Sequence, residues 1–178
     1  MPGPISPPPC STANAIKNIL RIGSRSPLVR TIWKITLDLA SCAINVATGE
    51  IEAGQRWRFK EILDKGAAVI LQADAAVCGG ISEWRRIAQT AASYGVTMCP
   101  HWLHELHVHL VASAPNARYV EYFPDDKVLN FRKLLNRQLE AKEGHLLLPQ
   151  TPGLGFEFDE SSIAKFGLNG PQPWAIVR

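Results

Sequence analysis

The sequence of 178 residues lacks several features that would assign it to a specialised class of protein. It has no run of about 18 apolar residues, so the pattern predicts no transmembrane helix. Its four cysteines include no Cys-x-x-Cys pair and lie at irregular spacings, so neither a disulfide framework nor a zinc ribbon is indicated. The apolar core of a secretory signal is also missing from the N-terminus. We therefore expect reduced thiols and a cytoplasmic location.

The sequence also lacks a strong net charge, which is only +3. Residues 1–49 carry five basic side chains against one acid, whereas residues 50–178 carry 14 basic and 15 acidic side chains. Because the excess is confined to the N-terminal quarter, we expect neither nucleic acid nor a membrane as a partner of the remainder. The basic, acid-poor N-terminus also fits an organelle transit peptide, although its prolines weaken that alternative.

The length and composition indicate one folded domain. Hydrophobic residues make up 46% of the chain, enough for a buried core. A complete (β/α)8 barrel typically needs about 250 residues, so the chain is too short to form one. Five prolines among residues 2–9 predict an extended or disordered start. We divide the chain into a Pro-rich and then basic segment (1–42), a folded portion (43–168) and a tail (169–178).

From about residue 43, short apolar runs alternate with helical patterns, at a spacing of about 22 to 28 residues. The apolar runs are predicted as strands: 43–47, 69–71, 96–99 and 119–123. The helical patterns are 56–65, 82–94 with Ser82 as its N-cap and Gly95 as its stop, and 105–113. Strands that each lead into one helix are βα units, and nearly all-apolar strands are typical of a parallel sheet covered on both faces. The pattern therefore predicts an α/β fold with four consecutive βα-type units.

The C-terminal part is less regular. Residues 128–139 have the leucine spacing of a helix, and Glu143-Gly144 predicts a turn into residues 146–148. A loop is predicted over residues 151–156, and a short helix over residues 159–166.

Each predicted strand brings an ionisable residue to its carboxyl end. Glu50, Asp74 and His101 follow the first three strands, and Glu121 lies in the fourth. Ligands bind at this edge of parallel α/β folds, so we expect one site there. Polar loops alone would explain a single such residue, but four in succession favour a functional site.

The residue types at this edge suggest proton abstraction beside a carboxylate. A carboxylate at Asp74 would fix the ring tautomer of His101 and make it a general base. Glu50 is a hard oxygen ligand suited to Mg²⁺, and Glu121 would donate to a developing oxyanion. Trp102 follows His101 directly and is expected to shape the substrate pocket.

The histidines at 101, 104, 107 and 109 also suggest a zinc site. Zinc requires three or four converging ligands, and positions 107 and 109 do not share a helix face. We therefore favour His104, His107 and His109 as helix residues that line or support the site.

As an ordered set, the segments around these residues resemble the C-terminal barrel of the enolase superfamily, in its mandelate racemase and muconate-lactonizing branch, nearest to the acid-sugar dehydratases. The matching segments are Ala47-Thr48-Gly49-Glu50, Leu71-Gln72-Ala73-Asp74, Cys78-Gly79-Gly80-Ile81-Ser82-Glu83-Trp84, Pro100-His101, Asn116-Ala117-Arg118-Tyr119-Val120-Glu121-Tyr122 and Pro152-Gly153-Leu154-Gly155. The resemblance implies a partial (β/α) TIM-type barrel, about its C-terminal half.

The resemblance also implies an Mg²⁺-dependent hydro-lyase acting on a sugar acid. His101 would abstract the proton α to the carboxylate, paired with Asp74, and the β-hydroxyl would leave as water. Glu50 would be the last of three acidic Mg²⁺ ligands, and Glu121 would contact the substrate carboxylate. Racemisation or epimerisation shares the first step and is the alternative.

Two departures from the family motivate a second hypothesis. The family supplies two further acidic ligands, a Lys-x-Lys pair and a capping domain, whereas here Asp38 is the only acid before Glu50 and no Lys-x-Lys occurs. The loop after Glu50 is one residue longer than usual, so Glu52 competes for its role. The alternative is a catalytically inactive remnant, or a half-barrel that pairs with itself or a partner chain through open sheet edges.

Overall fold

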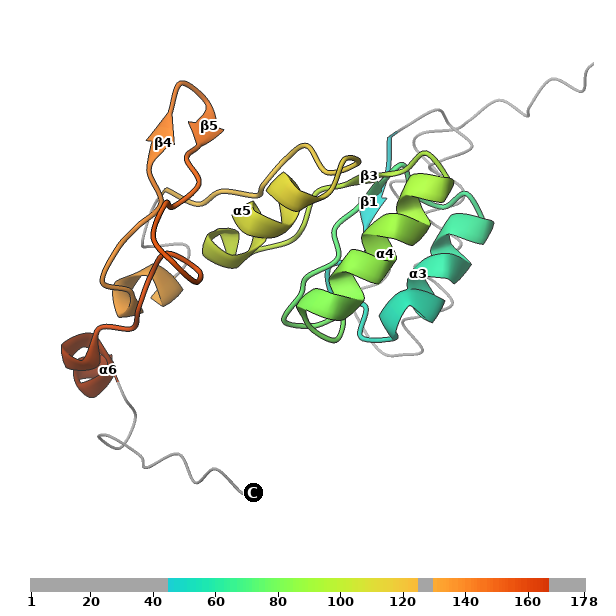
Figure 1. Ribbon diagram of the computed structural model, residues 1–178. Coiled ribbons are helices and arrows are strands. Elements are labelled where there is room, and N and C mark those ends of the chain that lie inside the picture. The colour runs from blue at the N-terminus through green and yellow to red at the C-terminus, as the bar shows by residue number, and fades with distance from the viewer. Residues whose placement is uncertain (1–44, 125–129, 167–178) are drawn as a thin grey trace, which may run out of the picture.

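The computed structural model describes residues 45–124 and 130–166 (Figure 1). In this part of the chain, three short strands form a parallel sheet in the order β1 (Ala47–Thr48), β2 (Ile70–Leu71) and β3 (Thr97–Met98). Ala47 is in register with Ile70, which is in turn in register with Thr97. The parallel sheet predicted from the apolar runs is confirmed. The segments 1–42 and 169–178 lie outside the described residues.

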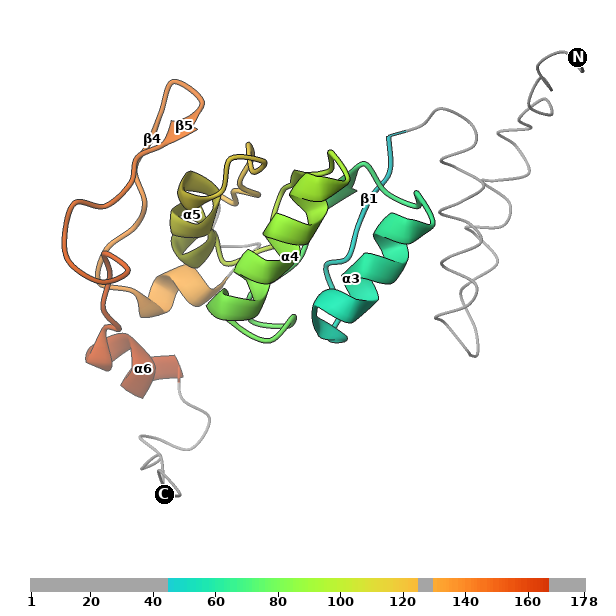
Figure 2. The ribbon, with the colours of Figure 1, turned by 45° about the vertical axis from the view of Figure 1, so that its right-hand side comes forward.

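Each strand leads into a helix, as expected for βα units. The helices are α3 (Gln55–Asp64), α4 (Ile81–Ser93) and α5 (His104–Ser113). Figures 1 and 2 show α4 between α3 and α5, so the helices follow chain order in space. Gly95, with φ 69°, ends α4 as predicted, but the N-cap is Gly80 rather than Ser82. A φ of 91° at Gly80 is readily available to glycine, so the helix starts before Ser82 can cap it.

The fourth predicted strand, residues 119–123, does not form. Only an isolated parallel bridge joins Met98 to Ala117, with Met98 N donating to Asn116 O at 2.9 Å. The Asn116 amide donates to Ala88 O and Val96 O, each at 3.0 Å. The Ala117 N–H donates to Ala114 O at 3.1 Å, so the chain turns there, and beyond the bridge at Ala117 residues 119–123 form no strand pairing among the described residues.

The C-terminal part combines a confirmed turn with a helix that is shorter than predicted. Within residues 130–166, only the 3-10 helix η1 (Asn130–Leu134) forms from the leucine-rich pattern, because Gln138 exchanges two hydrogen bonds with Arg132 and closes the chain into a turn. The turn at Glu143-Gly144 joins β4 (Ala141–Lys142) to β5 (His145–Leu146) in an antiparallel hairpin. The last predicted helix is α6 (Glu160–Phe166).

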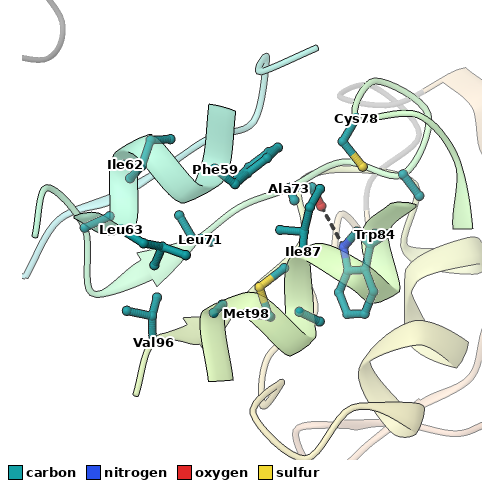
Figure 3. Close-up of a cluster of buried hydrophobic side chains, with 14 of the residues drawn as sticks. Phe59, Ile62, Leu63, Leu71, Ala73, Cys78, Trp84, Ile87, Val96 and Met98 are labelled. Atoms are coloured by element: carbon teal, nitrogen blue, oxygen red, sulfur yellow. Dashed lines mark hydrogen bonds between the residues drawn. The ribbon is translucent and has the colours of Figure 1, made fainter. Parts of the chain in front are cut away.

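The core lies between the sheet and helices α3 and α4 (Figure 3). Leu71 and Met98 contribute to it from adjacent, registered positions of β2 and β3. The largest buried side chains of the helices are Phe59, Ile62, Trp84 and Ile87. The Trp84 indole N–H donates to Ala73 O at 2.9 Å, which fixes the chain one residue before Asp74.

None of the helices in the described ranges has the length and apolarity that a membrane crossing requires.

The core packing predicts a clear contrast between two isoleucines of α4. Ile87 is 0% exposed and Ile81 is 45% exposed. Ile87→Ala leaves a cavity and should lower the free energy of unfolding by about 2–5 kcal/mol. Ile81→Ala is the matched control, with an expected change within about 0.5 kcal/mol. Urea unfolding followed by circular dichroism measures both, and equal losses would contradict this description of the core.

Candidate active site

The loops after β2 and β3 bring Asp74 and His101 together. Asp74 Oδ2 lies 3.4 Å from His101 Nδ1, and the Asp74 side chain is almost fully buried. The other oxygen, Oδ1, accepts a hydrogen bond of 2.8 Å from Ala76 N. That bond turns the carboxylate so that Oδ2 faces the imidazole. The 3.4 Å contact is close but is not a hydrogen bond, and His101 Nδ1 has no hydrogen-bond partner among the described residues. The arrangement places a carboxylate on the Nδ1 side of the ring and leaves Nε2 on the opposite side.

Glu121 and Trp102 lie beside this pair and contact each other. Glu121 Oε2 accepts a hydrogen bond of 2.8 Å from Trp102 N, and the Trp102 ring stacks on His101 with 5.4 Å between centroids. The Trp102 side chain is 44% exposed. Oε2 is therefore engaged with the loop.

The loop that carries His101 has an unfavourable backbone conformation. Trp102 has φ 55° and Leu103 has φ 30°, both in the left-handed region that non-glycine residues avoid. Each such residue costs on the order of 1–3 kcal/mol, so surrounding contacts must hold it in place. The bond from Trp102 N to Glu121 is one of these contacts.

Glu50 lies in the turn after β1, where it is half-buried. Gly49 precedes it with φ 107°, and a Cβ there would lie 2.8 Å from Phe59 Cε1, so this turn requires glycine. The competing carboxylate, Glu52, accepts a hydrogen bond from Arg58 Nε at 3.0 Å. Glu50 is therefore the better candidate for a metal-binding carboxylate at this strand end.

The described residues do not assemble a complete magnesium site. Among them, no group of three or more His, Cys, Asp or Glu side chains converges as a metal centre would require. Mg²⁺ requires near-octahedral oxygen ligation, and a single carboxylate such as Glu50 fits only one position. The histidines at 101, 104, 107 and 109 likewise do not converge on one point within the described part of the chain.

His107 is a buried residue of this site whose contacts the spacing of the histidines did not reveal. Its Nδ1 lies 2.8 Å from Trp102 O, and its Nε2 accepts a hydrogen bond of 3.0 Å from Ala75 N. Burial lowers the pKa of His107, while the bond to Trp102 O opposes this shift. The helical pattern correctly placed His107 in α5, but the contacts depend on how the two loops fold over the helix.

A second buried polar cluster attaches the C-terminal part to α5. His104 Nε2 lies 2.9 Å from Glu105 Oε1, and Arg132 Nε lies 3.8 Å from the same oxygen. Arg132 also donates to Phe123 O at 2.9 Å, and the Tyr122 ring meets the His104 ring edge-on. No sequence signal identified Arg132, because its partners are distant in the chain.

The two cysteines near this edge are not activated nucleophiles. Burial, with a smaller contribution from Asp74, raises the pKa of Cys78 to about 11. Burial also raises the pKa of Cys99. Both thiols therefore stay protonated near neutral pH, as expected for small packing residues.

Comparison with known proteins identifies relatives of this chain. The model of the "Enolase C-terminal domain-like" family matches residues 31–162. L-talarate/galactarate dehydratase of Salmonella typhimurium is 34% identical over 117 residues, which cover 66% of this chain and 28% of the relative. D-galactarolactone cycloisomerase of Agrobacterium fabrum is 32% identical over 142 residues, which cover 72% and 37%. The chain thus spans about a third of the length of these curated relatives.

A solved structure agrees with these matches. L-talarate dehydratase from Polaromonas sp. JS666, complexed with Mg and L-glucarate, superposes with a TM-score of 0.63 at 31% sequence identity. The match covers 72% of this chain and 36% of that one. The likeness bears out the predicted α/β fold as part of a TIM-type barrel.

The buried His107 predicts a specific pH dependence of stability. In the unfolded chain its pKa returns to an ordinary value of 6.5, so as the pH falls below this value the unfolded state binds more protons than the folded state. The free energy of unfolding should therefore decrease from pH 7 to pH 5, and H107Q should flatten this part of the profile. Carboxylates with lowered pKa values, such as Glu83, change the free energy of unfolding only below about pH 4.5. Urea titrations at each pH measure the effect, with H109Q as control; an unchanged slope in H107Q would contradict it.

Proposed function

Because the chain belongs to the enolase C-terminal domain-like family, we propose that His101 and Asp74 are the base and its orienting carboxylate in proton abstraction from a sugar acid. The observation that carries the proposal is the 3.4 Å contact between Asp74 Oδ2 and His101 Nδ1 at the carboxyl ends of neighbouring strands. Asp74 lies on the Nδ1 side of the ring, so Nε2 is the nitrogen that takes the proton.

The proposed reaction is the loss of water from the sugar acid. His101 removes the proton α to the carboxylate, and the C–H electron pair passes into an enediolate. The C–O bond to the β-hydroxyl then breaks, the leaving oxygen takes the proton back from the imidazolium, and water departs. Glu121 Oε1 and the Trp102 ring border the substrate. The names of two relatives, both dehydratases of six-carbon diacids, support this class of reaction and substrate.

Racemisation or epimerisation is the second reaction class, and it shares only the first step. If the proton returns to the opposite face of the enediolate, the product is an epimer or racemate rather than a dehydrated acid. The similarity to a cycloisomerase is consistent with more than one outcome on this framework.

We propose Mg²⁺ as the cofactor, with Glu50 as one of its ligands. The dehydratase structure that holds Mg supports this assignment. The described residues do not supply a full ligand set, so the steps above are assigned only to this chain's own side chains.

The half-barrel hypothesis provides a second candidate role, in which activity requires a partner chain. In the described part, Ala47 is exposed and its registered neighbours Ile70 and Thr97 are only partly buried. This row lies on the sheet face opposite the helix-covered core, the face that would line a complete barrel. A second copy, or another half-barrel, would bury it.

Exchange of the α-proton tests the proposed function. The full chain is incubated in D2O with Mg²⁺ and galactarate or L-talarate, and loss of the α-proton signal is followed by ¹H NMR. We expect exchange that falls about 10²- to 10⁴-fold in H101N, because the general base is removed. H109N is the matched control and should exchange like the wild type.

The same assay separates the two candidate roles. Exchange by the chain alone supports the hypothesis that it is active without a partner chain. The half-barrel hypothesis is supported if exchange occurs only after the N-terminal barrel half of a dehydratase is added, and if the two chains co-elute in size-exclusion chromatography. The proposed function is wrong if neither mixture exchanges, or if H101N exchanges as fast as the wild type.

A further inference from the structure

We propose that His107 is a positioning residue that sets the geometry of Asp74 and His101 by binding the peptide groups that follow each of them. The proposal rests on the proposed function of that pair, and extends it to a residue of α5 that does not contact the reacting atoms. The buried imidazole of His107 then has one defined tautomer and a role in positioning the two loops.

The two hydrogen bonds of His107 reach both halves of the pair. Ala75 N donates to Nε2 at 3.0 Å, and Ala75 directly follows Asp74. Nδ1 lies 2.8 Å from Trp102 O, and Trp102 directly follows His101. One rigid ring therefore links the loop after β2 to the loop after β3, at one residue from each member of the pair.

The chemistry of these partners allows only one tautomer. A carbonyl oxygen can only accept, so Nδ1 must carry the hydrogen that reaches Trp102 O. A backbone N–H can only donate, so Nε2 must keep its lone pair for Ala75. His107 is therefore neutral, with its proton on Nδ1.

The charged neighbour of the ring does not alter this assignment. Asp74 Oδ1 lies 3.6 Å from His107 Nε2, beyond hydrogen-bond distance, and although its charge favours the protonated ring, burial is the larger effect on the pKa of His107. The ring is 0% exposed, and burial disfavours its charged form. His101 and His104, the other titratable groups near the ring, would also disfavour a positive charge on it.

The strained loop needs the contact that His107 supplies. Trp102, with φ 55°, is held at its N–H by Glu121 and at its carbonyl by His107. Without the imidazole, the Ala75 N–H would be buried without a partner, at a cost of about 1–3 kcal/mol, and the part-buried Trp102 carbonyl would lose its hydrogen bond. The loop would then relax and carry His101 away from Asp74.

The other histidines of α5 do not form this link. His104 is equally buried, but its ring faces Glu105 in its own helix. His109 lies 3.0 Å from Leu154 O, in the C-terminal part. His109 is therefore a matched control, because its replacement removes a histidine hydrogen bond from the same helix without touching either loop.

The first test is an NMR measurement on the unaltered full chain, which needs neither a variant nor activity. In ¹⁵N-labelled protein, we expect His107 to show the Nδ1–H tautomer and a scalar coupling across the hydrogen bond from Ala75 N to Nε2. A His107 ring that is charged at pH 7, or that carries its proton on Nε2, overturns the proposal.

The second test uses variants to separate positioning from a role in stability alone. H107F removes both hydrogen bonds, whereas the side-chain amide of H107Q can replace them. We expect the His101 ring resonances to shift in H107F, to return toward their wild-type positions in H107Q, and to stay unchanged in H109Q. Unchanged His101 resonances in folded H107F contradict the proposal; if H107F does not fold, failure of H107Q to keep the wild-type resonances does so.

Kinetics complete the test wherever α-proton exchange is observed. H107F should lower kcat on the order of tenfold to a hundredfold, because a displaced base loses its alignment, with KM changed less than about twofold. An equal kcat in H107F and wild type overturns the proposal. If no variant or wild type exchanges, the proposed function fails, while the NMR measurements still decide the role of His107.

Discussion

The parallel register of β2 and β3 is the constraint on which the site depends. Leu71 and Met98 are registered partners, and Asp74 and His101 each lie three residues beyond them. Equal offsets from a registered pair bring the two side chains to the same edge of the sheet. The core strengthens this register, because Leu71 and Met98 belong to the same buried cluster.

Hydrogen bonds then turn this proximity into a defined contact. Ala76 N orients the Asp74 carboxylate, and Trp84 fixes the chain just before it through Ala73 O. On the other loop, Glu121 holds Trp102 N in a conformation that tryptophan does not favour. Each such bond contributes only about 1 kcal/mol net, but an unmade buried bond costs more. The bond from Trp84 to Ala73 O is buried, so its loss would be costly, whereas the bond from Trp102 N to Glu121 is exposed.

The sequence predicts the features of the fold and the site that depend on the local pattern of apolar and polar residues. Asp74 and His101 follow apolar runs, so their approach could be expected once the sheet was taken as parallel. Other features depend on contacts that no local pattern encodes. The run at 119–123 looks like a strand, but the chain turns between Ala114 and Ala117 before it. Trp102 adopts a left-handed conformation in which its backbone N–H donates to Glu121. The residue type at position 102 does not predict this conformation.

Asp74 and His101 stay in contact only if side chains lock the two loops that carry them. Hydrogen–deuterium exchange of the backbone amides of Ala75 and Trp102 tests it most directly. Locked loops should exchange as slowly as Cys99 N, which donates to Leu71 O across the strands. Exchange as fast as that of the exposed Ala53 amide would show that the loops open freely, and would contradict the account.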